Sequence, residues 1–136
     1  MSYQNEIMTY RFQELFYNYF NKSIEKIERL KADASNRKIY RLISGYTSCI
    51  GVLNDNIPEN KAFIGFSKGF KKGELNVPEI YNVSDDCEFY ILEDLGNATL
   101  FHTQKDSNKR ELTILNYYQL ALKHLKEFQY KGLDYI

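Results

Sequence analysis

The sequence predicts an α+β fold, in which an antiparallel five-stranded sheet carries one packed helix and is flanked by an N-terminal helix and a C-terminal helix. Two observations support this class. Three strand-like segments precede a helix-like segment and two strand-like segments follow it, with turn residues between them. The end segments instead repeat apolar residues every three or four positions, as amphipathic helices do. The length, 136 residues, is that of about one domain.

The N-terminal segment, 3–20, is predicted to be a helix that ends at 21–23. Its apolar stripe, largely aromatic, consists of Met8, Phe12, Leu15, Phe16 and Tyr19. Aromatic stripes of this kind more often pack in a core than bind a ligand. The next segment, 23–31, places Ile24, Ile27 and Leu30 among charged residues. A strand and a helix both fit this spacing, and we predict a strand.

The first predicted hairpin follows a turn at 32–37, whose Asp, Ser and Asn residues bend the backbone through local side-chain bonds. A strand at 38–44 then turns at Gly45 into a second strand at 48–53. The second strand offers an apolar surface on which a flat ring could lie. This surface is made by Cys49, Ile50, Val52 and Leu53.

The central helix is predicted to begin at Asn56 and to end at Gly73. Asn56 is a good N-cap, Pro58 is tolerated in the first turn, and Glu59 suits the positive end of a helix. The apolar face of this helix is predicted to carry Ala62, Phe63, Phe66 and Phe70.

A second hairpin is predicted to join strands at 79–83 and 88–92 through a turn at 84–86. Its second strand stops at two acids, Glu93 and Asp94, just before a glycine turn.

Beyond Leu100, the sequence predicts a polar linker over 101–108 and a long helix over 109–129. One face of this helix is apolar and carries Leu112, Leu115, Tyr118, Leu122, Leu125 and Phe128. Such a face would normally pack against a further layer, so we expect either a longer protein or a partner-requiring domain. A dimer made through the exposed terminal helices is one such arrangement.

Charge and cysteine content limit the function classes. The chain has 18 basic and 18 acidic residues, so it lacks the positive field of a nucleic-acid-binding protein. Cys49 and Cys87 have no metal-ligand spacing, and we expect reduced thiols in a cytoplasmic protein. The polar first residues, and the lack of a long apolar span, predict neither a secretory signal nor membrane association.

Two sequence blocks after the central helix carry a family resemblance. They read Val-Pro-Glu-Ile-Tyr at 77–81 and Leu-Glu-Asp-Leu-Gly at 92–96, and the helix start at Glu59 precedes them. In this order and spacing, 35–100 resembles the N-terminal lobe of the aminoglycoside phosphotransferase and choline kinase-like family, which has a protein-kinase-like fold. The resemblance implies an N-terminal helix at 1–22, a nucleotide-binding lobe at 23–100, and the linker and first helix of a truncated C-terminal lobe at 101–136.

The resemblance also implies a site for ATP. Main-chain groups of Glu93, Asp94 and Leu95 would read the adenine edge, and Leu92 leads into this hinge. The candidate apolar roof consists of Ile50 and Val52. Magnesium would accompany ATP, with its ligands in the missing lobe.

The phosphate-covering loop departs from the family pattern because 33–37 contains no glycine. Ser35 and Asn36 still offer side-chain donors. Arg37 and Arg41 alternate onto one strand face and can both reach phosphate, although exposed edge-strand charges are an equally good interpretation.

A second departure concerns the third strand, where the family has a lysine that pairs with a helix acid. No lysine lies near 52–54, so Glu59 lacks its expected partner. Lys38, Arg41 or Arg37 could substitute from the neighbouring strand. A helix-start acid that only complements the helix dipole is the other interpretation of Glu59.

The family's His-x-Asp segment, with its following Asn and metal-binding Asp, is absent, and His102 and His124 are interpreted as surface or packing residues. No catalytic residue or metal ligand is therefore predicted in this chain. The first hypothesis is the N-terminal ATP-binding lobe of a small-molecule phosphotransferase, with a sugar alcohol group as a candidate acceptor and with the chain inactive alone. The alternative is a non-enzymatic kinase-like scaffold module that docks a protein partner.

Overall fold

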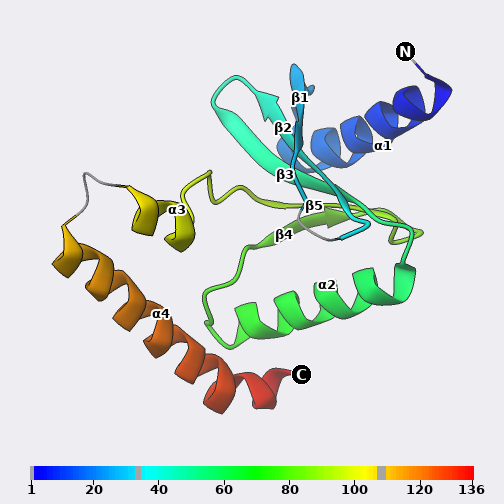
Figure 1. The fold of residues 1–136 in the computed structure, drawn as a ribbon. Helices are drawn as coiled ribbons and strands as arrows, with labels where there is room; N and C mark the ends of the chain where they lie inside the picture. Colours follow the sequence, from blue (N-terminus) through cyan, green and yellow to red (C-terminus); the bar gives the residue numbers. More distant parts are fainter. Residues whose placement is uncertain (1, 33–34, 107–109) are drawn as a thin grey trace.

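The computed structural model describes residues 2–32, 35–106 and 110–136, and it contains one five-stranded sheet with a helix against each face (Figure 1). The strands are β1 (Lys26–Leu30), β2 (Lys38–Ser44), β3 (Thr47–Leu53), β4 (Ile80–Val83) and β5 (Phe89–Glu93). The helices are α1 (Tyr3–Phe20), α2 (Ile57–Lys72), α3 (Leu100–Lys105), α4 (Glu111–Lys131) and the short 3-10 helix η1 (Gly132–Tyr135). The predicted fold class is confirmed.

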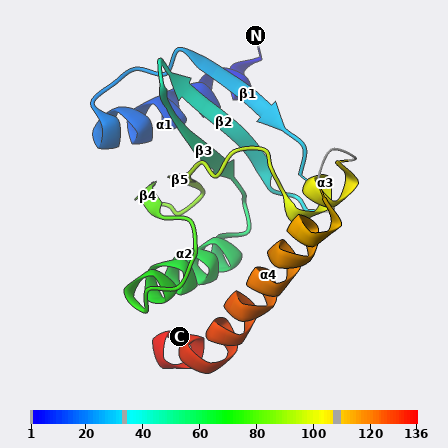
Figure 2. The same ribbon diagram turned by 90° about the vertical axis from the view of Figure 1, so that its left-hand side faces the viewer.

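The sheet is antiparallel throughout and has the strand order β1-β2-β3-β5-β4 (Figure 2). The segment that fitted both a strand and a helix is the strand β1, which pairs with β2. The predicted hairpin of β2 and β3 turns at Gly45, whose φ of +57° is a conformation that favours glycine. β5 lies between β3 and β4, so its apolar residues are buried on both faces.

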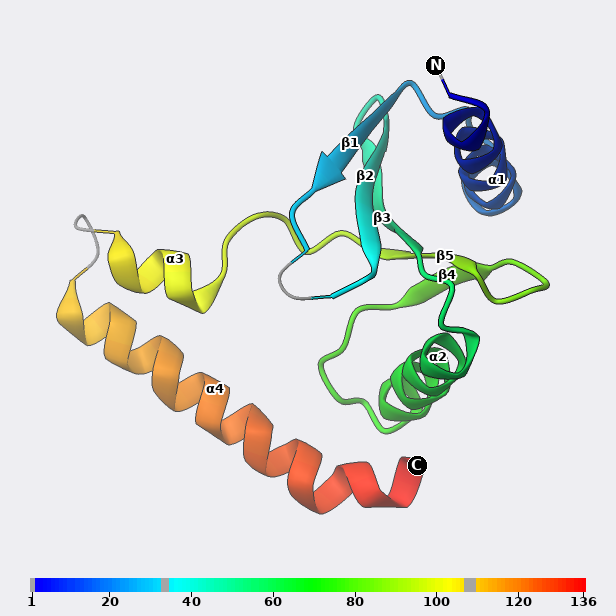
Figure 3. The ribbon, with the colours of Figure 1, turned by 45° about the vertical axis from the view of Figure 1, so that its right-hand side comes forward.

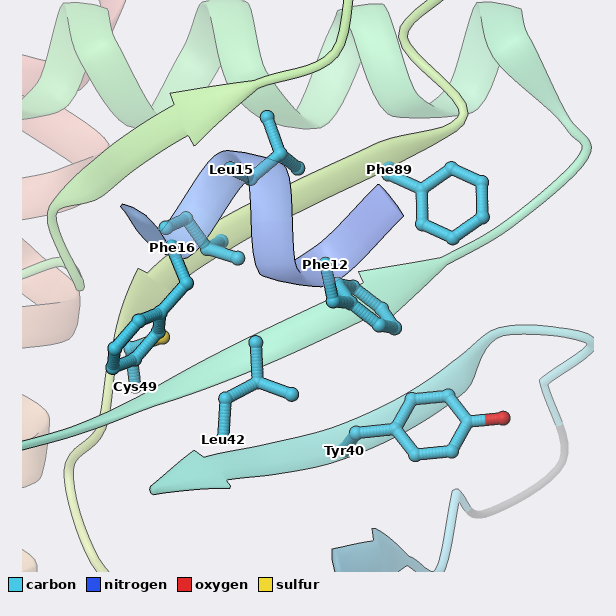
Figure 4. Close-up of a cluster of buried hydrophobic side chains, with 8 residues drawn as sticks. Phe12, Leu15, Phe16, Tyr40, Leu42, Cys49 and Phe89 are labelled. Carbon is cyan, nitrogen blue, oxygen red and sulfur yellow. The ribbon is translucent and has the colours of Figure 1, made fainter. Parts of the chain in front are cut away.

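Helix α1 covers one face of the sheet with an aromatic core (Figure 4). Phe12 and Phe16 are both 0% exposed, and the Phe12 ring meets the Phe89 ring edge to face at 5.2 Å. Gly51 permits this close approach, because a Cβ atom there would lie 2.7 Å from Cε1 of Phe12. Cys49 belongs to the same core, and burial raises the pKa of its thiol to about 12.

Helix α2 covers part of the opposite face. Its cap is confirmed, because Oδ1 of Asn56 accepts a hydrogen bond from the Glu59 amide at 3.2 Å. The predicted apolar face is wrong: the buried residues of the helix are Asn60, Ile64 and Ser67.

The phenylalanines of α2 are divided between two neighbours, which explains the error. Phe63 lies against Tyr90 of the sheet, with the ring centroids 5.7 Å apart. Phe70 instead meets Phe128 of α4 edge to face at 5.3 Å, and Phe66 is exposed. The helix therefore has two apolar sides, and only one of them faces the sheet.

The region predicted as a polar linker contains the helix α3, so that prediction is wrong. Thr99 is the N-cap of this helix, because its hydroxyl oxygen accepts a hydrogen bond from the His102 amide at 3.2 Å. Helix α4 follows and ends at η1, beside α2 (Figure 3). Gly73, the C-cap of α2, makes room for this contact, since a Cβ atom there would lie 2.7 Å from the Tyr135 ring.

Most of the apolar stripe predicted for α4 is exposed within the described residues. Leu112 and Leu122 have 68% and 64% of their surface exposed, whereas Phe128 is half-buried against α2. Within the described part of the chain, no helix has both the length and the apolarity needed to cross a membrane.

Candidate functional site

An open hollow of about 700 Å³ lies where the chain leaves β5, on the face of the sheet that α2 partly covers. Its floor is apolar and consists of Leu30, Ile39, Ile50 and Leu92. Its rim is formed by the main chain after β5, together with Arg41, Pro78 and His102. We call this space the first hollow.

Most of the predicted hinge and roof residues line the first hollow, and so does Arg41, which was predicted to reach phosphate. The hinge and roof residues are Ile50, Leu92, Glu93, Asp94 and Leu95. Val52 is the exception, because it lies under α2 and packs with Ile64 and Tyr90. No ligand tests the nucleotide-binding role of these residues, which stays a prediction.

The described part of the predicted phosphate loop, 35–37, lines a second hollow of about 450 Å³, and 33–34 lie outside the described residues. Ser35, Asn36 and Arg37 belong to it, and it shares Leu30 and Lys31 with the first hollow. The two spaces are therefore adjacent along the end of β1. Further cationic side chains of the second hollow come from Arg29 and Lys38.

The side chain of Asp94 ties the end of β5 to two neighbouring strands. Arg41 of β2 binds it through two hydrogen bonds, from Nε to Oδ2 at 2.7 Å and from Nη2 to Oδ1 at 3.1 Å. Ser48 of β3 donates to Oδ2 at 2.8 Å, and the Gly96 amide donates to Oδ1 at 2.9 Å. Only 12% of the Arg41 side chain and 8% of the Asp94 side chain are exposed.

Burial by itself disfavours the charged form of Asp94. The hydrogen bonds from Arg41, the Gly96 amide and Ser48 outweigh it and lower the pKa of this carboxyl below its usual value. The hydrogen bond to Asp94 in turn raises the pKa of Arg41. The pair is therefore ionised at neutral pH.

The residues before and after Asp94 differ in the hydrogen bonds of their main chain. The Glu93 amide donates to the Glu79 carbonyl at 2.9 Å, and the Glu79 amide donates to the Glu93 carboxylate at 3.1 Å, so the two sequence blocks that carry the family resemblance contact each other. In the part of the chain that the structure describes, the N–H and C=O groups of Leu95 have no hydrogen-bond partner. They border the first hollow and are available to a ligand.

Among solved structures, the chain is similar to the crystal structure of the "Putative fructosamine-3-kinase" from Haemophilus somnus 129PT, with a TM-score of 0.56 and 15% sequence identity. The likeness covers 68% of this chain and 35% of that chain, so this chain spans about a third of the length of the structure it matches. The fold is kinase-like. No family model matches the sequence, and no curated protein matches it.

Within this kinase-like sheet, Glu59 of α2 does have a cationic partner. Of the three residues considered as substitutes for the missing lysine, Arg37 is the one that pairs with Glu59. Its Nη2 atom donates to the Glu59 carboxylate at 2.6 Å. The Arg37 guanidinium also lies over the Phe63 ring, 5.2 Å from its centroid. Its Nε atom is buried without a hydrogen-bond partner among the described residues.

Three polar residues that support these ion pairs were not identified from the sequence. They are Ser48, Asn54 and Asn60. Asn54 donates to the Glu59 carboxylate at 3.1 Å, and Asn60 donates to the Asn54 carbonyl at 2.7 Å. An asparagine on the sheet-facing side of a helix was the available signal, because a buried amide needs hydrogen-bond partners.

Proposed function

We propose that this chain is the N-terminal, ATP-binding lobe of a small-molecule phosphotransferase similar to the aminoglycoside and choline kinases. One observation supports this most: the first hollow combines an apolar floor with the unpaired main-chain groups of Leu95. An adenine ring needs apolar surfaces for its faces and a donor and an acceptor for its polar edge, and this hollow offers both.

In this proposal the phosphates extend toward the second hollow. The two hollows share Leu30 and Lys31, so they adjoin each other at the end of β1. Arg37 and Lys38 supply positive charge there, and Ser35 and Asn36 supply donors. Glu59 holds the Arg37 guanidinium in place.

The described residues offer no preformed cluster of magnesium ligands. Among 2–32, 35–106 and 110–136, no three His, Cys, Asp or Glu side chains are grouped so that they could hold a metal ion. Asp94, at the rim of the first hollow, is fully engaged by Arg41, Ser48 and Gly96. We therefore assign the magnesium ligands, the catalytic base and most acceptor contacts to a further part of the whole protein.

The whole enzyme would transfer a phosphoryl group from ATP to an alcohol group, and we propose a sugar as the acceptor class. This chain alone binds nucleotide and does not transfer phosphate. The free thiols Cys49 and Cys87 fit the cytoplasmic location that the sequence predicts.

Titration calorimetry with adenosine and with ATP tests the proposal. We expect both ligands to bind, and Ile39→Asp to abolish binding, because a charge on the floor would lose its water when the base covers it. Tyr46→Asp, at a fully exposed turn position, is the control and should leave both affinities unchanged. If the wild-type chain gives neither heat nor a thermal shift with millimolar ligand, the nucleotide proposal is wrong.

A second function, a kinase-like scaffold that docks a protein partner, is supported by the apolar stripe on α4. This helix packs against α2 through Phe128 and exposes Leu112 and Leu122 on another side. A helix that is apolar on several sides is usually covered on all of them. Light scattering over a range of concentrations checks the simplest case, a dimer through this stripe. Leu122→Glu should then favour the monomer, and a wild-type chain that stays monomeric at all concentrations excludes self-association.

A further inference from the structure

The carboxylate of Asp94 has no capacity left for a ligand. Its Oδ1 atom accepts hydrogen bonds from Arg41 and from the Gly96 amide, and its Oδ2 atom accepts from Arg41 and from Ser48. Four hydrogen bonds are about the full capacity of a carboxylate. Arg41 is nearly as enclosed, so the pair borders the first hollow without offering it a free charge.

The charges around Arg41 and Arg37 also differ. Glu28 lies opposite Arg41 across β1 and β2, so Arg41 faces two carboxylates, Glu28 and Asp94. A phosphate beside Arg41 would therefore approach two carboxylates, of which Glu28 is also paired with Lys26 at 2.6 Å. Arg37 has one carboxylate partner, Glu59, and lies with Lys38 along the second hollow, whereas Lys31 lines both hollows.

The network around Asp94 fixes the main chain that borders the hollow. Asp94 is tied to β2 through Arg41 and to β3 through Ser48. It also binds the amide of Gly96, whose φ of +81° completes a tight turn. Leu95 lies between these two anchored residues, so the direction of its N–H and C=O groups depends on the network.

We propose that Arg41 and Asp94 are positioning residues for the nucleotide base, and that Arg37 is the arginine that meets phosphate. The inference rests on the proposed nucleotide-binding function and refines it. It replaces the expectation that Arg37 and Arg41 both reach phosphate.

Titration calorimetry with adenosine, which carries no phosphate, and with ATP separates the two roles in the whole chain. Arg41→Gln and Asp94→Asn should weaken both ligands by the same factor, about three- to tenfold, which corresponds to one lost hydrogen bond. Arg37→Gln should weaken ATP by at least that factor and leave adenosine unchanged. Arg41→Lys keeps the charge and should restore part of the affinity for both ligands.

Arg11→Gln is the matched control. It removes an ion pair of similar length, 2.6 Å to Asp86, that lies away from both hollows. It should leave the affinities for adenosine and ATP unchanged. All titrations are made at a temperature at which circular dichroism shows every variant folded. If Arg41→Gln does not fold, Ser48→Ala removes one bond of the same network and should weaken both ligands equally.

Two results with the variants overturn this inference alone. Arg41→Gln could weaken ATP and spare adenosine, which would assign Arg41 to phosphate. Alternatively, folded Arg41→Gln and Asp94→Asn could bind both ligands as the wild type does, which would make the pair purely structural. A wild-type chain that binds neither ligand is a different failure, because it removes the proposed function and this inference with it.

Discussion

Helix α1 buries the centre of its face of the sheet, whereas α2 leaves part of the opposite face open. On the α1 face, Phe12 and Phe16 fill the space above the strands and are fully buried. On the α2 face, Val52 is covered, but Ile39 and Ile50 remain at the floor of the first hollow. Because stabilisation grows with buried apolar area, the closed face should contribute most to stability, and the open face keeps room for a ligand.

The largest effect is expected at the centre of the closed face. Phe12→Ala should lower the free energy of unfolding by about 3–5 kcal/mol, because it leaves a cavity among aromatic rings. Urea denaturation measures this change. Tyr10→Ala on the same helix, where the side chain is 69% exposed, should change it by no more than about 0.5 kcal/mol. Similar losses at both positions would contradict the assignment of stability to this face.

A larger side chain between α1 and the sheet should also destabilise the fold. Gly51→Ala is expected to cost about 1–3 kcal/mol, since its Cβ atom would meet the Phe12 ring. Thermal unfolding of the single and double variants checks this. Combined with Phe12→Leu, the same substitution should cost clearly less, and an unchanged cost would show that Phe12 is not the obstacle.

A smaller effect on stability is expected on the open face. Ile39→Ala should cost about 1 kcal/mol or less, because its side chain lines the first hollow and is only half-buried. Leu42→Ala, on the same strand but fully buried under α1, should cost about 2–5 kcal/mol. Urea denaturation compares the two. Equal costs would mean that the two faces do not differ.

The smallest effect on stability is expected from acid, which protonates Asp86 at the edge of the face that α1 covers. Hydrogen bonds from Ser84, and then from Arg11 and the Glu88 amide, lower the pKa of Asp86 from 3.8 to about 2, against the opposing effect of burial. Because this pKa is lowered by folding, its stabilisation is present above about pH 4 and is lost as the pH falls toward 2.

The Asp86 side chain is 48% exposed, so solvent screening limits the loss to about 1 kcal/mol or less. Thermal unfolding from pH 5 to pH 2 should therefore show a shallower decline for Asp86→Asn than for the wild type. Parallel declines would show that the Asp86 contacts do not contribute.

Local signals in the sequence were sufficient for most of the fold. The apolar spacing of α1 and the turn at Gly45 led to the observed elements, because each depends on neighbouring residues. The sheet-facing side of α2 was not predictable in this way. Periodicity finds an apolar side, but it does not show whether a sheet or another helix covers it, and α2 meets both. The short α3 was missed because a threonine cap is a weak signal in a polar segment.

The candidate site was predictable as a set of charges and apolar residues, but its pairings were not. Arg41 and Asp94 are 53 residues apart, and Arg37 and Glu59 are 22 residues apart. Their pairing depends on the register of β2 and on where β5 and α2 begin and end, which are properties of the assembled sheet. The sequence therefore allowed three partners for Glu59, and the fold selects Arg37.

The position of α1 has a consequence for how the chain acquires its structure. Arg11 pairs with Asp86, 75 residues later, and Phe12 packs on Phe89 of β5. During translation, α1 is made well before Asp86 and Phe89, so these two contacts of the helix are missing in the early nascent chain. Contacts between such distant segments form slowly because a long loop must close first. The contacts of α1 with β5 can therefore form only after nearly a hundred residues of chain have been synthesised, whereas its contact with Tyr40 of β2 needs far less.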